Sequence, residues 1–225
     1  AEDGIRDYKV TGVQTCALPI YAFTNLDSGP LFQKKSFKLS NENVGFRRHG
    51  ANEYQANFSE SEREVLINLS EQIIELLAER VDHDHQDPLA AMVGITVHDA
   101  PPEDEVLLRL LPNAYADEQA ASEFRRYTES TLRDKKRAHA MAMRSNLINA
   151  GDNAIDIDHE GAMAWLGGMN DIRLALGVRL KIEDNSQAQQ ERLELLKPDD
   201  PLRAVYAVYT WLGWLQESLI QALMD

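Results

Sequence analysis

One stretch of the sequence, residues 158–180 (DHEGAMAWLGGMNDIRLALGVRL), most strongly limits the folds open to this chain. Its large apolar residues recur at intervals of three and four, the period of a helix buried along one side. They are Trp165, Met169, Ile172, Leu176 and Leu180. Leu174 and Val178 lie on the opposite side of the same helix. A helix that is apolar on both sides needs neighbours on both sides, so this stretch predicts the central helix of an all-α domain.

Further helices are predicted around this one. A capping box of Ser59 with Glu62, or of Ser61 with Glu64, precedes an apolar repeat that ends near Arg80. Helices are also predicted over 103–111 and 116–149, through 193–196, and from 200 to the C-terminus, while residues 150–158 read as a turn. Residues 46–58 predict a short β-hairpin. The pattern predicts a mainly all-α fold, an orthogonal or irregular bundle of about five to seven helices with a short N-terminal β-hairpin.

The net charge restricts the partners of the chain. Its formal value is −14 over 225 residues. Because nucleic acids and anionic membranes are polyanions, this charge opposes non-specific binding to either, and any such contact has to be local. The sequence contains no run of about 18 apolar residues, the length that is needed to span a bilayer. Residues 18–23 are too short for the apolar core of a signal peptide. We therefore expect a soluble, cytoplasmic protein.

The first twenty residues, AEDGIRDYKVTGVQTCALPI, show no helical or strand period and resemble the translation of a sequencing-library adapter along their whole length. We expect this segment to lie outside the fold. It contains Cys16, the only cysteine, so the rest of the sequence has no thiol for a disulfide switch, a nucleophile or a zinc ligand. Residues 21–43 read as an extension, either disordered or upstream of an alternative start codon at Val44. Residues 44–225 are predicted to form a single helical domain.

The predicted helix over 116–149 carries seven of the 23 lysines and arginines of the chain, grouped in a short stretch. Between 123 and 144, seven cations face three carboxylates, which gives a local charge of +4. We select the cations Arg125, Arg126, Arg133, Lys135, Lys136 and Arg137 as candidates for binding a protein partner or DNA. They could equally offset neighbouring acidic helices. The apolar side of this helix is expected to contain Phe124, Tyr127, Thr131, Ala138, Ala142 and Leu147. No helix-turn-helix spacing is present.

Two tryptophans in the last predicted helix are further candidates for a binding surface. Trp211 and Trp214 lie away from the apolar seam of that helix, so they either cover a second helix contact or form an exposed aromatic patch. A structural ion pair is expected between Arg173, at the edge of the central helix, and Glu217, because an unpaired buried charge is costly. The pair Gly167-Gly168 indicates close helix approach.

A weaker pattern suggests metal binding. The segment VDHDHQD contains His83 and His85, and His98 follows in a second loop, so these histidines and the nearby aspartates could bind a divalent metal. The alternative is a solvated loop, since no scaffold fixes the histidines. The acidic residues around Asp158 are better explained by helix capping. No catalytic residue and no cofactor are predicted.

Three blocks resemble a known family. They are LLPNAYADEQAASEFRRYTESTLRDKKRAHA (110–140), AWLGGMNDIRLALGVRL (164–180) and VYTWLGWLQESLIQAL (208–223). They are similar to an actinobacterial family described as domain of unknown function 2017, or AosR-like oxidative-stress regulators. GFRRHGANEY resembles the first strand of that family, so the resemblance covers about residues 44–225.

The resemblance implies a non-enzymatic transcriptional regulator. Members of the family are expected to act with a stress-responsive sigma factor, and so with RNA polymerase, to raise expression of cysteine-biosynthesis genes. The characterised type senses oxidant through a cysteine pair. This sequence departs from that type because it has no cysteine after residue 20, so its regulation is expected to act through another group or another protein. Two alternatives remain: a metal-binding protein or metal-dependent hydrolase, and an adaptor of a protease complex.

Overall fold

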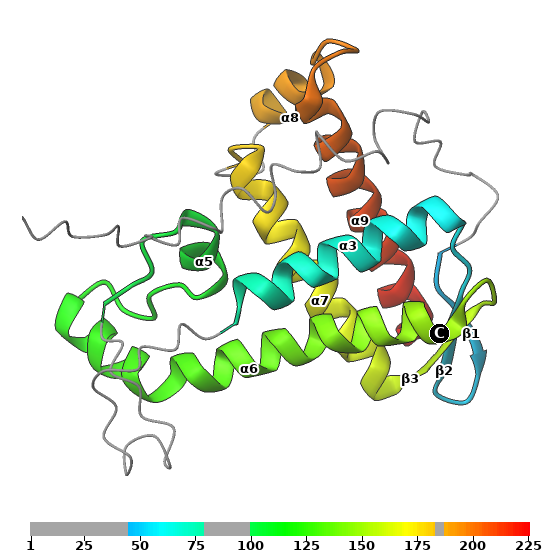
Figure 1. Cartoon of the computed structure of the whole chain (residues 1–225), viewed down its shortest axis with the longest axis horizontal. Coiled ribbons are helices and arrows are strands. Elements are labelled where there is room, and N and C mark those ends of the chain that lie inside the picture. Colours follow the sequence, from blue (N-terminus) through cyan, green and yellow to red (C-terminus); the bar gives the residue numbers. More distant parts are fainter. Residues whose placement is uncertain (1–44, 79–99, 183–186) are drawn as a thin grey trace, which may run out of the picture.

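The computed structural model describes residues 45–78, 100–182 and 187–225. The elements of this part are β1 (Arg47–Gly50), β2 (Glu53–Ala56), α3 (Glu60–Leu76), α5 (Glu105–Leu110), α6 (Glu118–Ala150), β3 (Ile155–Asp158), α7 (His159–Arg179), α8 (Gln187–Glu194) and α9 (Pro201–Met224). Figure 1 shows α3 beside one half of the long helix α6, with α7 and α9 crossing them and the three strands gathered near the end of α9. The predicted, mainly helical fold with five to seven helices is confirmed, since the described part contains six.

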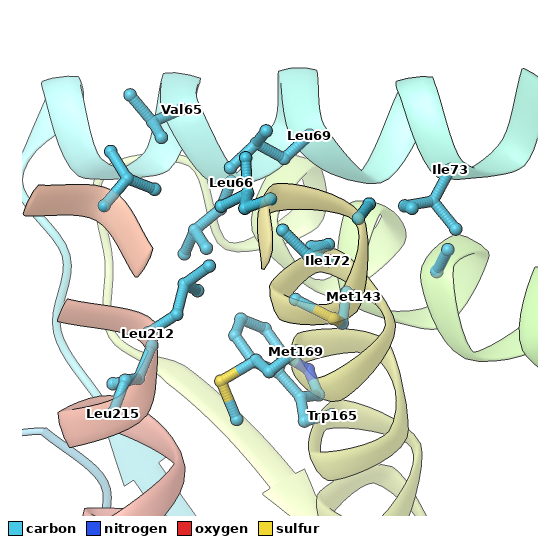
Figure 2. Close-up of a cluster of buried hydrophobic side chains, with 14 of the residues drawn as sticks. Val65, Leu66, Leu69, Ile73, Met143, Trp165, Met169, Ile172, Leu212 and Leu215 are labelled. Atoms are coloured by element: carbon cyan, nitrogen blue, oxygen red, sulfur yellow. The ribbon is translucent and has the colours of Figure 1, made fainter. Parts of the chain in front are cut away.

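The central role of α7 is also confirmed. All five apolar residues that were predicted to share one face of this helix have no solvent exposure, while Leu174 and Val178 are half-buried and pack against the same core. Figure 2 shows Trp165, Met169 and Ile172 of α7 meeting side chains from α3, α6 and α9. The helix therefore has packing neighbours on both sides, as its two apolar faces require.

The approach of α6 to α7 depends on the two adjacent glycines. The imidazole of His139 lies over Gly167, and the sulfur of Met143 lies over Gly168. A methyl group on either glycine would overlap the side chain that faces it. The glycines therefore serve the close helix contact that the sequence indicated, at the expense of helix propensity.

The ends of the main helices follow the predicted capping signals. Ser59, and not Ser61, begins α3: its backbone N–H donates to the Glu62 carboxylate at 2.8 Å, and the Glu62 N–H donates to the Ser59 hydroxyl. Asp158 begins α7 by accepting a hydrogen bond from the Gly161 N–H at 2.8 Å. Asp200 begins α9 ahead of a proline at the first helical position.

The sheet has one strand more than the sequence predicted. The expected hairpin forms β1 and β2, and β2 pairs with β3 in antiparallel register, with Tyr54 opposite Ile157. The prediction that residues 150–158 form only a turn is wrong. Alternation in Ile155-Asp156-Ile157-Asp158 places both isoleucines in the core and both aspartates at the surface, which is the pattern of a strand buried on one face.

The predicted apolar side of α6 is also wrong over the first half of the helix. Phe124 and Tyr127 are 44% and 55% exposed, and of the predicted set only Leu147 is fully buried. The buried side instead contains Ala121, Arg125, Glu129, Ala140, Met143 and Leu147. At 33 residues, α6 is about 50 Å long, and its amino-terminal half extends past the end of α3 (Figure 1). The aromatic residues in that half therefore do not reach the shared core.

Several predictions concern residues outside the described ranges. They are the adapter-like segment 1–20, the extension 21–43, the proposed start at Val44, and the histidines His83, His85 and His98. Among the residues that are described, no helix is both long and apolar enough to cross a membrane.

Candidate protein-interaction surface

Two of the predicted cations form a buried network at the start of α6. Arg125, only 5% exposed, donates to the Leu111 carbonyl at 3.1 Å and to Asn113 Oδ1 at 2.7 Å, and it forms an ion pair with Glu129. Arg133 reaches the other oxygen of Glu129 at 2.7 Å. Burial alone would raise the pKa of Glu129, but the two guanidinium groups hold it below its usual value. Arg125 therefore fixes the loop before α6 to the helix, while Arg133 supports the charge of Glu129 from the next turn.

Lys136 is likewise committed to the fold. Its ammonium group lies 2.5 Å from the carboxylate of Asp171, which is 2% exposed on α7. Burial raises the pKa of Asp171, and Lys136 opposes that rise by favouring the charged carboxylate. Nearby, burial lowers the pKa of His139. Because Lys136 joins α6 to α7 inside the protein, it is not available to a partner.

Three predicted cations remain exposed, but they do not share one patch. Arg126 and Arg137 are eleven residues apart and lie along one edge of α6. Lys135 is nine residues from Arg126, about two and a half turns, and so lies near the opposite side of the helix. Exposed Glu123 and Asp134 further reduce the surface charge. The local charge of +4 is therefore largely offset within the fold, and the helix does not present a continuous basic track for a nucleic acid.

Aromatic side chains are the more distinctive feature of this half of α6. Tyr115, in the loop before the helix, packs edge to face against Phe124, with their ring centroids 5.6 Å apart. These residues are 52% and 44% exposed. Lys135 lies on the same side of α6 as Phe124, about three turns further along. We call Tyr115, Phe124 and Lys135 the aromatic face.

The two tryptophans of α9 have different environments. Trp211 is 5% exposed, and its ring meets Phe58 edge to face at 6.4 Å, within the aromatic core that includes Phe46 and Trp165. Trp214 is 49% exposed. Only Trp214 can therefore contact a partner without a change of fold.

Arg173 is held by α9 through a neutral side chain. Its guanidinium donates to Gln216 Oε1 at 2.7 Å and lies 4.8 Å from the centroid of the Tyr209 ring. Glu217, the next residue after Gln216, is exposed and accepts a hydrogen bond from Gln221. Helix geometry explains the difference, since adjacent residues point about 100° apart and only Gln216 faces α7.

The structure does not test the histidine-based metal site, because His83, His85 and His98 lie outside the described ranges. Within residues 45–78, 100–182 and 187–225, no group of three or more His, Cys, Asp or Glu side chains is arranged to hold a metal ion.

Neither aromatic member of the aromatic face was selected from the sequence as a binding residue, since Phe124 was assigned to the apolar side of the helix and Tyr115 was not singled out. Tyr115 lies in an irregular loop, where no periodicity marks a residue as exposed or buried. The signal that could have found Tyr115 is that residues 116–123, between it and Phe124, are all small or polar, so an aromatic side chain there has few apolar neighbours to cover it.

The fold and the surface together define a class: a mainly helical domain with a small antiparallel sheet, whose longest helix presents exposed aromatic and charged side chains along one half. The chain belongs to the family described as domain of unknown function (DUF2017), whose sequence model matches residues 43–223.

Similar proteins include regulators from mycobacteria. The oxidative stress regulator AosR of Mycobacterium tuberculosis (strain H37Rv) is 31% identical over 186 residues, which cover 76% of this chain and 82% of that protein. The oxidative stress regulator AosR of Mycobacterium bovis shows the same identity and coverage. No solved structure matches this chain.

Proposed function

We propose that this protein is a non-enzymatic transcriptional regulator of the oxidative-stress response that acts by binding a protein partner, a sigma factor or RNA polymerase. Its relatives are named as oxidative stress regulators, which supports the biological role. The partner and the expected effect on cysteine-biosynthesis genes rest on family resemblance. One structural observation supports a binding function over a catalytic one: the exposed Tyr115 and Phe124 pair on α6.

The physical argument concerns the cost of exposing aromatic rings. Large aromatic side chains bury 150–250 Å² each when covered, at about 25 cal/mol per Å², so two half-exposed rings hold several kcal/mol of unused burial. Protein interfaces are enriched in such residues at their energetic centres. Lys135 lies on the same side of the helix, about 16 Å further along, which favours a partner with an acidic residue at that distance from its apolar contact. The aromatic face is therefore the proposed partner surface.

The test is a pull-down with the full chain as bait, from nuclease-treated actinobacterial lysate, read by mass spectrometry for sigma factors and RNA polymerase subunits. The test variant is Phe124→Ser with Lys135→Glu. Both residues are exposed, so the variant should melt within a few degrees of the wild type. We expect at least about a tenfold loss of recovery, equivalent to about 1.4 kcal/mol of binding free energy.

A matched control is Leu195→Ser with Lys197→Glu, which makes the same chemical changes on an exposed segment after α8, where Leu195 is 82% exposed. It should retain wild-type recovery. Equal recovery by the wild type, the test variant and the control would refute the aromatic face as the partner surface. A further variant, Trp214→Ser, tests the exposed tryptophan of α9, and loss of recovery in this variant alone would place the partner surface on α9. Absence of both sigma factor and polymerase from the wild-type bait would refute the proposed function itself.

A further inference from the structure

A second surface of α6 has a charge pattern that is symmetric about one residue. Counting from Ser130, Glu123 lies seven residues before and Arg137 seven residues after, while Arg126 lies four before and Asp134 four after. Positions four and seven residues apart share one face of an α-helix. Each carboxylate therefore has a cation at the mirrored position. We call Glu123, Arg126, Asp134 and Arg137, together with Tyr127, the Ser130 stripe.

The stripe lies on the solvent side of α6. All four charged residues are exposed, and Tyr127, three residues before Ser130, is 55% exposed. None of the four forms an ion pair with another side chain in the described part of the protein, whereas Arg125, Arg133, Lys136 and Arg144 all do. The stripe therefore consists of side chains that the described fold does not use.

We propose that the Ser130 stripe binds the same stripe of a second copy of this chain, with the two α6 helices antiparallel and a two-fold axis passing close to Ser130. In that arrangement each residue faces its mirrored position, so Glu123 faces the Arg137 of the other copy and Arg126 faces its Asp134. A two-fold interface repeats every contact, which gives four pairs of opposite charge. A parallel arrangement would instead place each charge against its own kind.

This pairing is independent of the proposed partner function, because the aromatic face lies along a different edge of α6. A charge of −14 on each copy opposes association at long range, so the four local pairs have to outweigh it. The dimer is therefore expected to dissociate within the concentration range of solution experiments.

Sedimentation velocity on the full chain tests the proposal directly. The wild type should shift, with rising concentration, from 25.4 kDa towards twice that mass. An acidic variant, Arg126→Glu with Arg137→Glu, makes all four stripe charges negative, and a basic variant, Glu123→Arg with Asp134→Arg, makes them all positive. Each variant alone should be monomeric, with dimerisation weakened at least tenfold. Mixed in equal amounts, the two should form a heterodimer, since every facing pair is then of opposite charge.

The matched control is Arg48→Glu with Arg203→Glu, which changes the net charge by the same amount away from α6 and should still dimerise. A monomeric wild type at every concentration overturns the proposal, as do variants that dimerise as strongly as the wild type. Failure of the mixed variants to associate also overturns it. A monomeric wild type whose acidic variant loses thermal stability would show that the chain's own residues cover the stripe.

Discussion

Replacing Gly168 with alanine tests whether the close contact between α6 and α7 governs stability. A methyl group at the ideal position on Gly168 would lie 2.2 Å from the sulfur of Met143 and 3.2 Å from its Cγ. Met143 has no solvent exposure, so its side chain cannot turn outward to make room. The two helices would have to separate, or Met143 would have to adopt a strained rotamer.

The expected magnitude follows from two opposing effects. Overpacking a filled core costs about 1–3 kcal/mol, and the full burial of Met143 places this site at the upper end. Alanine is favoured over glycine in a helix by about 1 kcal/mol. The net prediction for Gly168→Ala is a loss of about 2 kcal/mol, or about 4–8 °C in melting temperature for a domain of this size.

The same helix provides a control of opposite sign. At Gly177, the nearest atom to an added methyl group is Tyr209 Cε2 at 4.0 Å, an ordinary van der Waals distance. Gly177→Ala should therefore stabilise the protein by about 1 kcal/mol. Urea unfolding of both variants, followed by circular dichroism, measures the two changes. If Gly168→Ala were as stable as Gly177→Ala, the close-contact explanation would be refuted.

Three further predictions concern buried charged or titratable groups. Arg63 is 8% exposed and donates to three backbone carbonyls, those of Leu147, Phe58 and Asn153, so Arg63→Met should lower the free energy of unfolding in urea by about 2–4 kcal/mol. Arg63→Lys should recover little of this loss, because one ammonium group cannot reach all three carbonyls. Asp171→Leu alone leaves the Lys136 ammonium group without its partner, so the double variant Asp171→Leu with Lys136→Met should be more stable to urea than Asp171→Leu. A double variant less stable than Asp171→Leu would contradict the role of this ion pair. Burial lowers the pKa of His139, so the folded state binds fewer protons there than the unfolded state, and the contribution of His139 to stability is complete above about pH 6.5 and falls as the pH drops below that value. In melting experiments across this pH range, His139→Gln should lose less stability in acid than the wild type. An unchanged pH profile would count against this explanation.

Periodicity and capping chemistry were sufficient to predict most of the fold. The burial of Trp165 and its helix neighbours follows from spacing alone, because that spacing places them on one side of a helix. The ends marked by Ser59 and Asp158 follow from the hydrogen bonds that their side chains make with the first helical turn. Strand β3 was missed because four residues are too short to show a period by themselves.

The surface was harder to predict because a charge run does not show which charges are paired. Lys136 and Lys135 are adjacent in sequence, yet one is bound to Asp171 on another helix and the other is exposed. The exposure of Phe124 depends on where α3 ends beside α6, which is a property of packing. Long-range neighbours therefore decided both cases, and a single sequence does not contain them.

The most direct test of the proposed function is photo-crosslinking from the aromatic face inside actinobacterial cells. A photoreactive phenylalanine analogue is incorporated at position 124 of the full chain, and in a parallel strain at exposed position 195 as a control. After oxidant treatment and irradiation, we predict a crosslink to a sigma factor or an RNA polymerase subunit from position 124 and none from position 195. Absence of those proteins from the position 124 crosslinks, in cells where the protein is folded and abundant, would contradict the proposal.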